Sequence, residues 1–182
     1  MGLLQVDTFT VTSAVASVII GGGSSGSSST NFAINTDDVY MVAYSNVFCS
    51  ANDDIGIRVT TSGTPDSDSE YDYASKDLKA SGTFGNTTGR VNLDDFDFSA
   101  GVGTSGTHSD NGILYLYNFN NSSEFSFITI ENVTNRADNS TDLFGFQGGG
   151  VHTVAEANDG ISFRCKSGNN FVSGTYTLYK VV

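Results

Sequence analysis

The alternation of apolar and polar side chains in the closing stretch, residues 160–182, is the feature that most constrains the fold. Ile161, Phe163 and Cys165 stand at every second position with polar residues between them, and residues two apart on a strand point to the same face of a sheet. Residues 167–170 are of types that tolerate a reversing backbone, and strand-forming residues follow to the end of the chain. The closing stretch therefore predicts a hairpin that belongs to the core.

Alternating segments of the same kind recur along the chain, separated by turns rich in glycine, serine and asparagine. About ten to twelve short strands with such turns are typical of an antiparallel sandwich or barrel. Segments 113–119 and 124–132 predict a second hairpin, because a polar four-residue turn joins them. The expected strand at residues 90–99 changes its apolar face near Asp94, which indicates a bulge. The fold class is therefore expected to be all-β.

Several segments have weaker patterns. Residues 31–35 alternate over a short span and predict a strand. Residues 74–80 are the one helical candidate, and they overlap a stretch, 76–89, whose mixture of polar residues and glycine indicates a loop. Two short strands are expected at 143–146 and 151–155, with a glycine-rich turn between them.

The domain organisation follows from one low-complexity tract. Residues 21–30 are almost entirely glycine and serine, a composition typical of a flexible coil. This tract is either a linker or a long loop. We expect residues 1–20 to form an N-terminal β arm or attachment segment, and residues 31–182 to form the β-sandwich domain.

The charge of the chain excludes two classes of partner. The formal net charge is −12, and the 8 lysine and arginine residues do not cluster. A nucleic-acid-binding protein neutralises phosphates with a basic face, and anionic membrane surfaces attract basic segments in the same way. No segment is long and apolar enough to span a membrane as a helix. We therefore expect neither nucleic acid nor membrane as a partner.

The chain has 2 cysteines, Cys49 and Cys165. A disulfide-built secreted domain of this size has more of them. Cys165 shares the apolar face of its expected strand, and Cys49 lies at the end of another. Both are interpreted as buried apolar residues, and a single bridge between them stays open.

Acidic residues are the only groups dense enough to suggest a metal site. Asp66, Asp68, Glu70 and Asp72 alternate along one segment, and Ca²⁺ takes six to eight oxygen ligands that such a loop can supply. They are candidate ligands of a structural calcium ion. A solvated acidic loop without a metal explains the same pattern.

The residues expected of an enzyme are absent. His108 and His152 are far apart and lack the spacing of known zinc motifs, so the sequence predicts no zinc site. There is also no nucleophile elbow and no phosphate-binding loop. A glycan-cleaving enzyme would need two carboxylates at a defined separation, which a sequence does not specify. We expect the protein not to be an enzyme.

Sugar binding is an alternative, since tyrosine rings can stack on sugar rings. Tyr71, Tyr73 and Tyr115 are the candidate stacking residues, and the loops at 61–70 and 100–111 are the candidate binding loops. Tyrosines in a core or a subunit interface are the competing interpretation.

The closing stretch resembles the ending of many tailed-bacteriophage virion proteins. In those proteins an I-x-F strand, here residues 161–163, leads to S-G-N at 167–169, S-G-T at 173–175 and a terminal L-Y at 178–179. The specific part of the resemblance covers about the last 25 residues. One departure is Lys180, where those chains often have glycine.

This resemblance implies a jelly-roll-like β-sandwich and a structural role on the particle exterior. Related proteins decorate capsids or form head fibres and tail appendages. We therefore expect a homotrimer that binds capsid or tail proteins. Residues 1–20 are expected to be the attachment segment, because they are apolar, rich in strand-forming residues and set off by the glycine- and serine-rich tract. The alternative is a receptor-binding module at a tail tip that recognises a glycan of the host surface.

Overall fold

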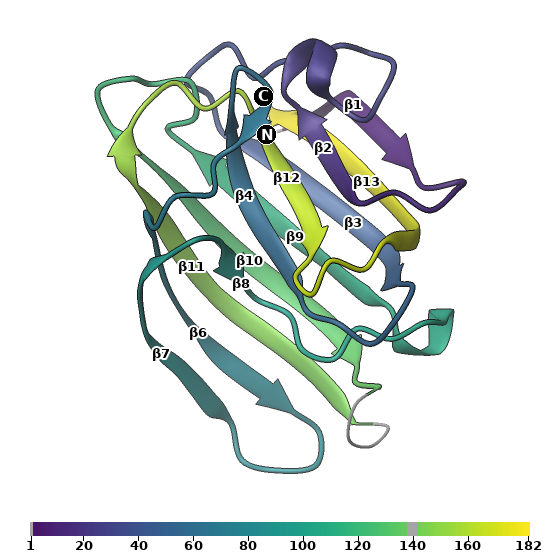
Figure 1. Ribbon diagram of the computed structural model, residues 1–182. Coiled ribbons are helices and arrows are strands. Elements are labelled where there is room, and N and C mark those ends of the chain that lie inside the picture. Colours follow the sequence, from purple (N-terminus) through teal and green to yellow (C-terminus); the bar gives the residue numbers. More distant parts are fainter. Residues whose placement is uncertain (1, 138–141) are drawn as a thin grey trace.

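The structure, a computed structural model, describes residues 2–137 and 142–182, which form two antiparallel β-sheets packed as a sandwich (Figure 1). In these residues the elements are, in chain order, β1 (Leu3–Thr10), β2 (Ser17–Gly21), the 3-10 helix η1 (Gly23–Ser25), β3 (Tyr40–Cys49), β4 (Ile55–Thr61), β5 (Thr64–Pro65), β6 (Tyr71–Lys79), β7 (Gly85–Leu93), β8 (Phe96–Asp97), the 3-10 helix η2 (Gly106–His108), β9 (Asp110–Tyr117), β10 (Phe125–Asn135), β11 (Leu143–Ala155), β12 (Gly160–Cys165) and β13 (Phe171–Val181). The prediction of an all-β antiparallel sandwich is confirmed. Its jelly-roll-like connectivity stays a prediction.

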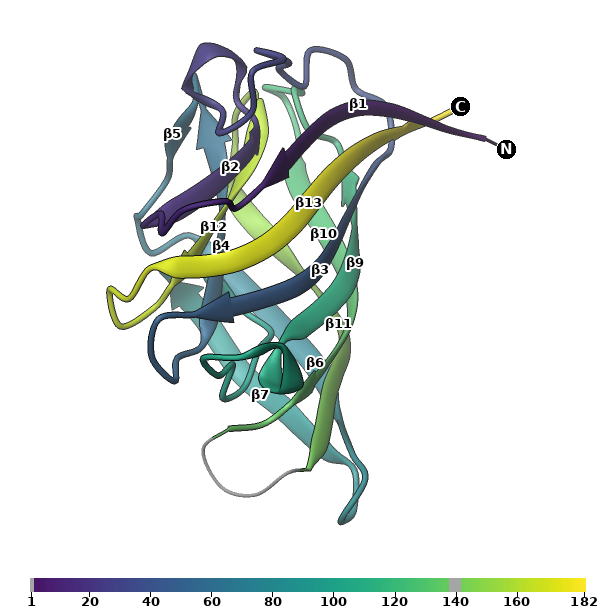
Figure 2. The same cartoon turned by 90° about the vertical axis from the view of Figure 1, so that its right-hand side faces the viewer.

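The two sheets differ in size. The larger has eight strands in the order β1-β13-β3-β9-β10-β11-β6-β7, and the smaller has β2-β12-β4-β5 with β8 paired to β4. The first four strands alternate between the two sheets. Figure 2 shows the larger sheet twisting along its length, with β1 and β13 inclined to β11 and β6. The hairpin predicted from residues 113–132 is confirmed, since β9 and β10 pair antiparallel.

The core lies between the sheets and is rich in aromatic rings. Tyr44 of β3 and Tyr176 of β13 pack on Phe163 of β12, with ring centroids 5.6 and 5.0 Å from it. Further along the sandwich, Tyr71 meets Phe96 edge to face at 4.8 Å. Buried apolar area is the main favourable term in folding, and the inward-facing residues of both sheets supply it.

The closing stretch forms two core strands but no hairpin. β12 pairs with β2 and β4 in the smaller sheet, whereas β13 pairs with β1 and β3 in the larger. The turn between them therefore carries the chain from one layer to the other. Asp53 holds this turn, accepting hydrogen bonds from the Ser167 amide at 3.0 Å and from Asn169 Nδ2 at 2.9 Å. Periodicity indicated the buried faces correctly, but it does not say which sheet a strand joins.

A disulfide links the two layers beside this turn. Cys49 at the end of β3 is bonded to Cys165 at the end of β12, with the Cα atoms 6.6 Å apart. Both residues are buried, as expected. The interpretation of the cysteines as unpaired apolar residues is corrected in favour of the open alternative, a single bridge.

The N-terminal segment 1–20 contributes a strand to each sheet. β1 pairs with β13 at the edge of the larger sheet, and β2 pairs with β12 in the smaller one. The sandwich thus includes this segment and does not begin at residue 31. Residues 31–35, expected as a strand, have no regular secondary structure, although Ile34 is buried.

The glycine- and serine-rich tract, residues 21–30, packs against the smaller sheet (Figure 1). Buried Asp7 of β1 accepts hydrogen bonds from the Gly21 amide at 2.9 Å and from the Thr30 hydroxyl at 2.6 Å. Gly22 has a φ of 76°, in the left-handed region that glycine adopts without steric cost. The tract is therefore a hydrogen-bonded loop between strands, and the expectation of a flexible coil is corrected.

The helix at 74–80 and the loop at 76–89 were wrong predictions. These residues form β6 and most of β7, which pair with each other, and β6 also pairs with β11. Tyr71, Tyr73 and Ser75 are buried at alternate positions, which is the period of a strand. Tertiary pairing therefore overrides the weak local signal.

Two further boundaries differ from the predictions. The glycines at 148–150 lie within one continuous strand, β11, because they pair with β10 on one side and β6 on the other. At Gly150 the ring of Phe96 leaves no room for a side chain, since a Cβ there would lie 2.5 Å from Phe96 Cε1. The predicted strand 90–99 divides at Asp94. There the chain leaves β7 in the larger sheet and enters β8 in the smaller, so the change of face marks a change of sheet.

Candidate functional site

The outer face of the larger sheet carries several exposed apolar side chains. β10 alternates strictly between exposed and buried residues. Its outward Phe127 and Val133 are 42% and 38% exposed, although large apolar side chains are usually buried. Ile113 and Tyr115 of β9 lie beside them on the same face. We call this surface, formed by the outward residues of β9, β10, β11 and β6, the outer face.

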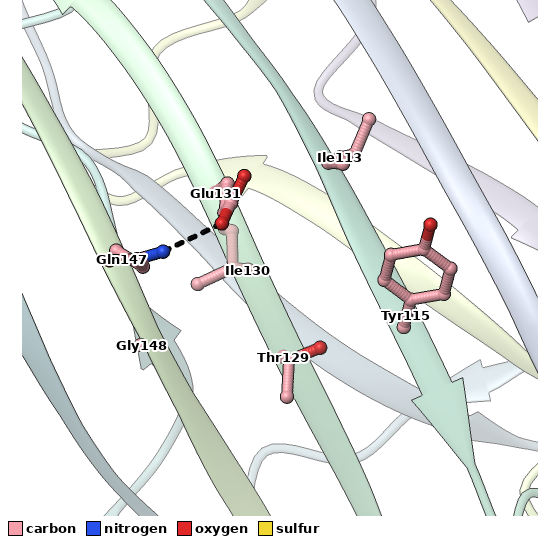
Figure 3. A pocket seen from close by; sticks show the side chains of 7 residues that line it. All are labelled: Ile113, Tyr115, Thr129, Ile130, Glu131, Gln147 and Gly148. Atoms are coloured by element: carbon pink, nitrogen blue, oxygen red, sulfur yellow. Dashed lines mark hydrogen bonds between the residues drawn. The ribbon is translucent and has the colours of Figure 1, made fainter.

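A groove runs along the middle of the outer face (Figure 3). Gln147 Nε2 of β11 donates a hydrogen bond of 2.7 Å to Glu131 Oε1 of β10. Tyr115 of β9 stands on the other side, opposite Thr129. The groove thus combines a half-buried aromatic ring with a carboxylate, an amide and a hydroxyl. Its lining residues are Ile113, Tyr115, Thr129, Ile130, Glu131, Gln147 and Gly148.

The outer face has few charges. Glu131 and Asp72 are the acidic residues at the outward positions of the four strands, and Lys76 is the basic one. The whole chain has 20 acidic residues and a net charge of −12. The negative charge therefore lies mainly on other surfaces.

The three candidate sugar-stacking tyrosines lie in two different places: two are buried in the core and one is at the surface. Tyr71 and Tyr73 face the core and are 0% and 6% exposed, and burial raises the pKa of Tyr73 to about 12. Neither ring can reach a ligand at the surface, so the interpretation of both as sugar-stacking residues is corrected. Tyr115 lines the groove, as a binding role requires.

The four candidate calcium ligands also do not lie together: two of them approach a histidine, and the other two lie apart from it. Asp66 and Glu70 converge on His152 of β11, whose Nε2 lies 2.9 Å from Asp66 Oδ2 and 3.4 Å from Glu70 Oε2. Asp68 is exposed to solvent, and Asp72 accepts a hydrogen bond of 2.7 Å from the Asn92 amide. The structure thus brings together two of the four, with a histidine that the sequence did not connect to them.

The local charges differ in their effects on Asp66 and Glu70. Burial and the neighbouring Asp66 carboxylate raise the pKa of Glu70. Burial also opposes ionisation of Asp66, but hydrogen bonds from the Asp68 amide and from His152 outweigh it and lower the pKa of that carboxyl. Two carboxyl groups are therefore crowded at one buried imidazole.

A second buried polar group lies in the core under β9. Asp110 is 1% exposed, accepts a hydrogen bond of 3.3 Å from the Tyr44 hydroxyl, and lies 3.3 Å from Asn132 Nδ2. Burial raises the pKa of Asp110 to about 8, although these hydrogen bonds oppose the shift. Sequence reasoning missed this group, because strand alternation alone does not say that an aspartate stands on the inward face.

Comparison with known proteins yields no relative: no family model, no curated protein and no solved structure matches the chain. Within the described residues, no helix is long and apolar enough to cross a membrane. The function is therefore argued from the surfaces themselves.

Proposed function

We propose that this chain is a structural protein on the exterior of a phage particle, a decoration or cement protein whose work is binding and not catalysis. Its copies associate through the outer face, as three copies if the resemblance of the closing stretch holds. A separate edge of the sandwich attaches the assembly to capsid or tail proteins.

The observation that carries the proposal is the charge of the outer face. Copies of a chain with a net charge of −12 repel one another over most of their surfaces. On the outer face Glu131 and Asp72 stand against Lys76, so two copies meet there with little repulsion. The exposed Phe127 and Val133 gain from burial in such a contact. A second copy of this chain is therefore the occupant that the face fits.

The attachment edge is the corner where the chain ends meet. β1 is an edge strand, and an edge strand offers unpaired backbone groups to a further strand. Leu3 and Leu4 are 52% and 54% exposed, and Val182 beside them is 62% exposed. These apolar residues support residues 1–20 as the attachment segment.

The disulfide supports an exterior location. Cytosolic thiols are kept reduced, whereas bridges persist outside the cell and on particle surfaces. The buried Cys49–Cys165 bridge fits a protein that works in an oxidising environment.

The mass of the purified protein in solution tests self-association. We expect a trimer by light scattering, and we expect Phe127→Asp to dissociate it, because the variant places a carboxylate in the middle of the contact. Phe84→Asp is the matched control: Phe84 is 69% exposed in the β6–β7 turn and lies outside the outer face. A monomeric wild-type protein, or equal dissociation by both variants, would contradict the proposal.

Attachment is tested separately on assembled particles. We expect the Leu3→Asp, Leu4→Asp double variant to stay trimeric and to lose binding to capsids or tails. Unchanged binding to particles would place the attachment elsewhere.

Carbohydrate binding is the second candidate, and the groove of Figure 3 favours it. A sugar ring stacked on Tyr115 would present its hydroxyl groups to Glu131 and Gln147, which are 2.7 Å apart. A glycan array with the wild-type protein and Tyr115→Ala tests it, with Tyr179→Ala on β13 as the control. Glycan binding lost only in Tyr115→Ala would favour this function over association through the outer face. The absence of any bound glycan would exclude it.

A further inference from the structure

His152 is a fully buried histidine surrounded by carboxylates. Its side chain is 0% exposed, while those of Asp66, Glu70 and Glu156 are 17%, 31% and 29% exposed. The imidazole therefore lies inside the sandwich, and the carboxylates reach it from the side that faces solvent. Nε2 faces Asp66 and Glu70, and Nδ1 faces Glu156.

On the opposite side of the ring, Nδ1 faces Glu156, and neither group makes a hydrogen bond there. His152 Nδ1 and Glu156 Oε1 are both buried and have no hydrogen-bond partner, and they lie 3.9 Å apart. Leaving a buried polar atom unpaired is unfavourable, because the atom loses its hydrogen bonds to water. A small shift of the Glu156 side chain would bring the two into a hydrogen bond and remove this cost.

The three ligand atoms on the Nε2 side have separations that suit a small cation. A tetrahedral ion with ligands at about 2.0–2.1 Å places them about 3.3 Å from one another. His152 Nε2 lies 2.9 Å from Asp66 Oδ2 and 3.4 Å from Glu70 Oε2, and the three atoms all lie within 4.8 Å of one another. Only small side-chain movements separate this arrangement from three corners of a tetrahedron, and a water molecule would supply the fourth ligand.

We propose that Asp66, Glu70 and His152 bind one divalent transition-metal ion of the zinc class, and that Glu156 orients the histidine by accepting a hydrogen bond from Nδ1–H. A histidine that binds a metal through one nitrogen usually donates the other N–H to a carboxylate or carbonyl. Glu156 stands where this second partner is needed. The proposal is independent of the function proposed above.

The donor set favours zinc over calcium. Imidazole nitrogen suits zinc and its neighbours in the transition series, whereas calcium takes six to eight oxygens. Asp68 and Asp72 do not join the cluster, so too few oxygens are present for calcium. The ligands form no zinc motif in the sequence, because they come from two segments about 85 residues apart.

A bound ion would join two parts of the sandwich. Asp66 and Glu70 belong to the loop between β5 and β6, and His152 belongs to β11 in the larger sheet. The ion would therefore fix that loop against the sheet and replace the repulsion between Asp66 and Glu70 by shared attraction.

Titration of the untagged, metal-free protein with zinc chloride in a calorimeter tests the proposal. We expect one ion per chain, a higher midpoint of thermal unfolding with zinc, and no saturable binding of calcium. With cobalt in place of zinc, we expect the visible absorption bands of a tetrahedral site. Absence of saturable zinc binding, or a calcium affinity equal to that for zinc, would overturn the proposal.

Single-residue variants distinguish the proposed metal ligands from residues that do not bind the ion. We expect Glu70→Gln to abolish tight zinc binding and Glu156→Gln to weaken it by about 10- to 100-fold. Asp68→Asn, in the same loop but exposed, and His108→Ala, which removes the other histidine, should bind zinc as the wild type does. Circular dichroism establishes that each variant is folded. Equal affinity of Glu70→Gln and wild type, or loss of binding in His108→Ala, would contradict the assignment.

Discussion

Asp110 is an acidic residue held without charge in an apolar core. A carboxylate in such a place loses its hydration, and hydrogen bonds with Tyr44 and Asn132 compensate only in part. The pKa of about 8 means that the folded protein keeps the proton of this group at neutral pH. The unfolded chain releases it near the ordinary value of about 3.9.

This difference predicts a loss of stability as the pH rises. Below about pH 4 both states are protonated, and the contribution of Asp110 is fully present. It is lost as the pH rises to about 8, since Asp110 ionises in the unfolded chain and this ionisation stabilises the unfolded state relative to the folded one. We expect Asp110→Asn, which cannot ionise, to gain several kcal/mol relative to the wild type over this interval.

Urea unfolding of both proteins across this pH range measures the effect. The relevant quantity is the difference in unfolding free energy between variant and wild type, because other carboxyl groups titrate equally in both. A difference that does not change with pH would show that Asp110 is ionised in the folded protein.

At the scale of elements, buried Asp7 holds the glycine- and serine-rich tract, residues 21–30, in one conformation through hydrogen bonds. The Asp7 carboxylate accepts hydrogen bonds from the Gly21 amide and from the hydroxyls of Ser28 and Thr30. The tract therefore forms a fixed connection from β2 towards β3. Serine- and glycine-rich composition alone predicts flexibility, since it does not reveal a distant acceptor.

We expect Asp7→Ala to destabilise the protein by about 3 kcal/mol, because it leaves several donors without their acceptor. Asp37→Ala is the control: Asp37 is exposed, and we expect a change of about 0.5 kcal/mol or less. Urea unfolding measures both. Equal effects would mean that water replaces the Asp7 carboxylate without cost.

Periodicity predicted most strands and their inward residues, including those of β9, β10, β12 and β13. It does not predict which strands pair, and for this reason it predicts a hairpin where β12 and β13 join different sheets. It also favours a helix over most of β6, whose strand conformation depends on pairing with β7 and β11. The same limit applies to the sites. Local patterns single out Tyr115 of the groove, and Asp66 and Glu70 of the metal cluster. His152 and Glu156 come close to Asp66 and Glu70 only through the pairing of β11 with β6.

On the scale of the whole molecule, the disulfide ties the two sheets together. Cys49 and Cys165 are 116 residues apart in sequence. A bridge that closes a loop of this size lowers the entropy of the unfolded chain, which in the chain-entropy account stabilises the folded protein by about 4–5 kcal/mol. The hydrophobic core and this bridge therefore stabilise the same contact between layers.

We expect the reduced protein to be less stable than the oxidised protein by about 3–5 kcal/mol in urea unfolding. Both cysteines are buried, so a reducing agent should act quickly only when denaturant opens the sandwich. Thiol titration of the native protein checks this second point. Rapid reduction without denaturant, or equal stabilities, would contradict these expectations.

The meeting of the chain ends has a consequence for engineering. The Gly2 amide donates a hydrogen bond of 2.6 Å to the Val182 carbonyl, and both ends lie at one corner of the sandwich (Figure 2). A protein fused before residue 2 and another fused after residue 182 would lie side by side at this corner. A short peptide joining these ends would close the backbone into a ring, so that new ends could be opened at a surface turn such as the one around Gly82.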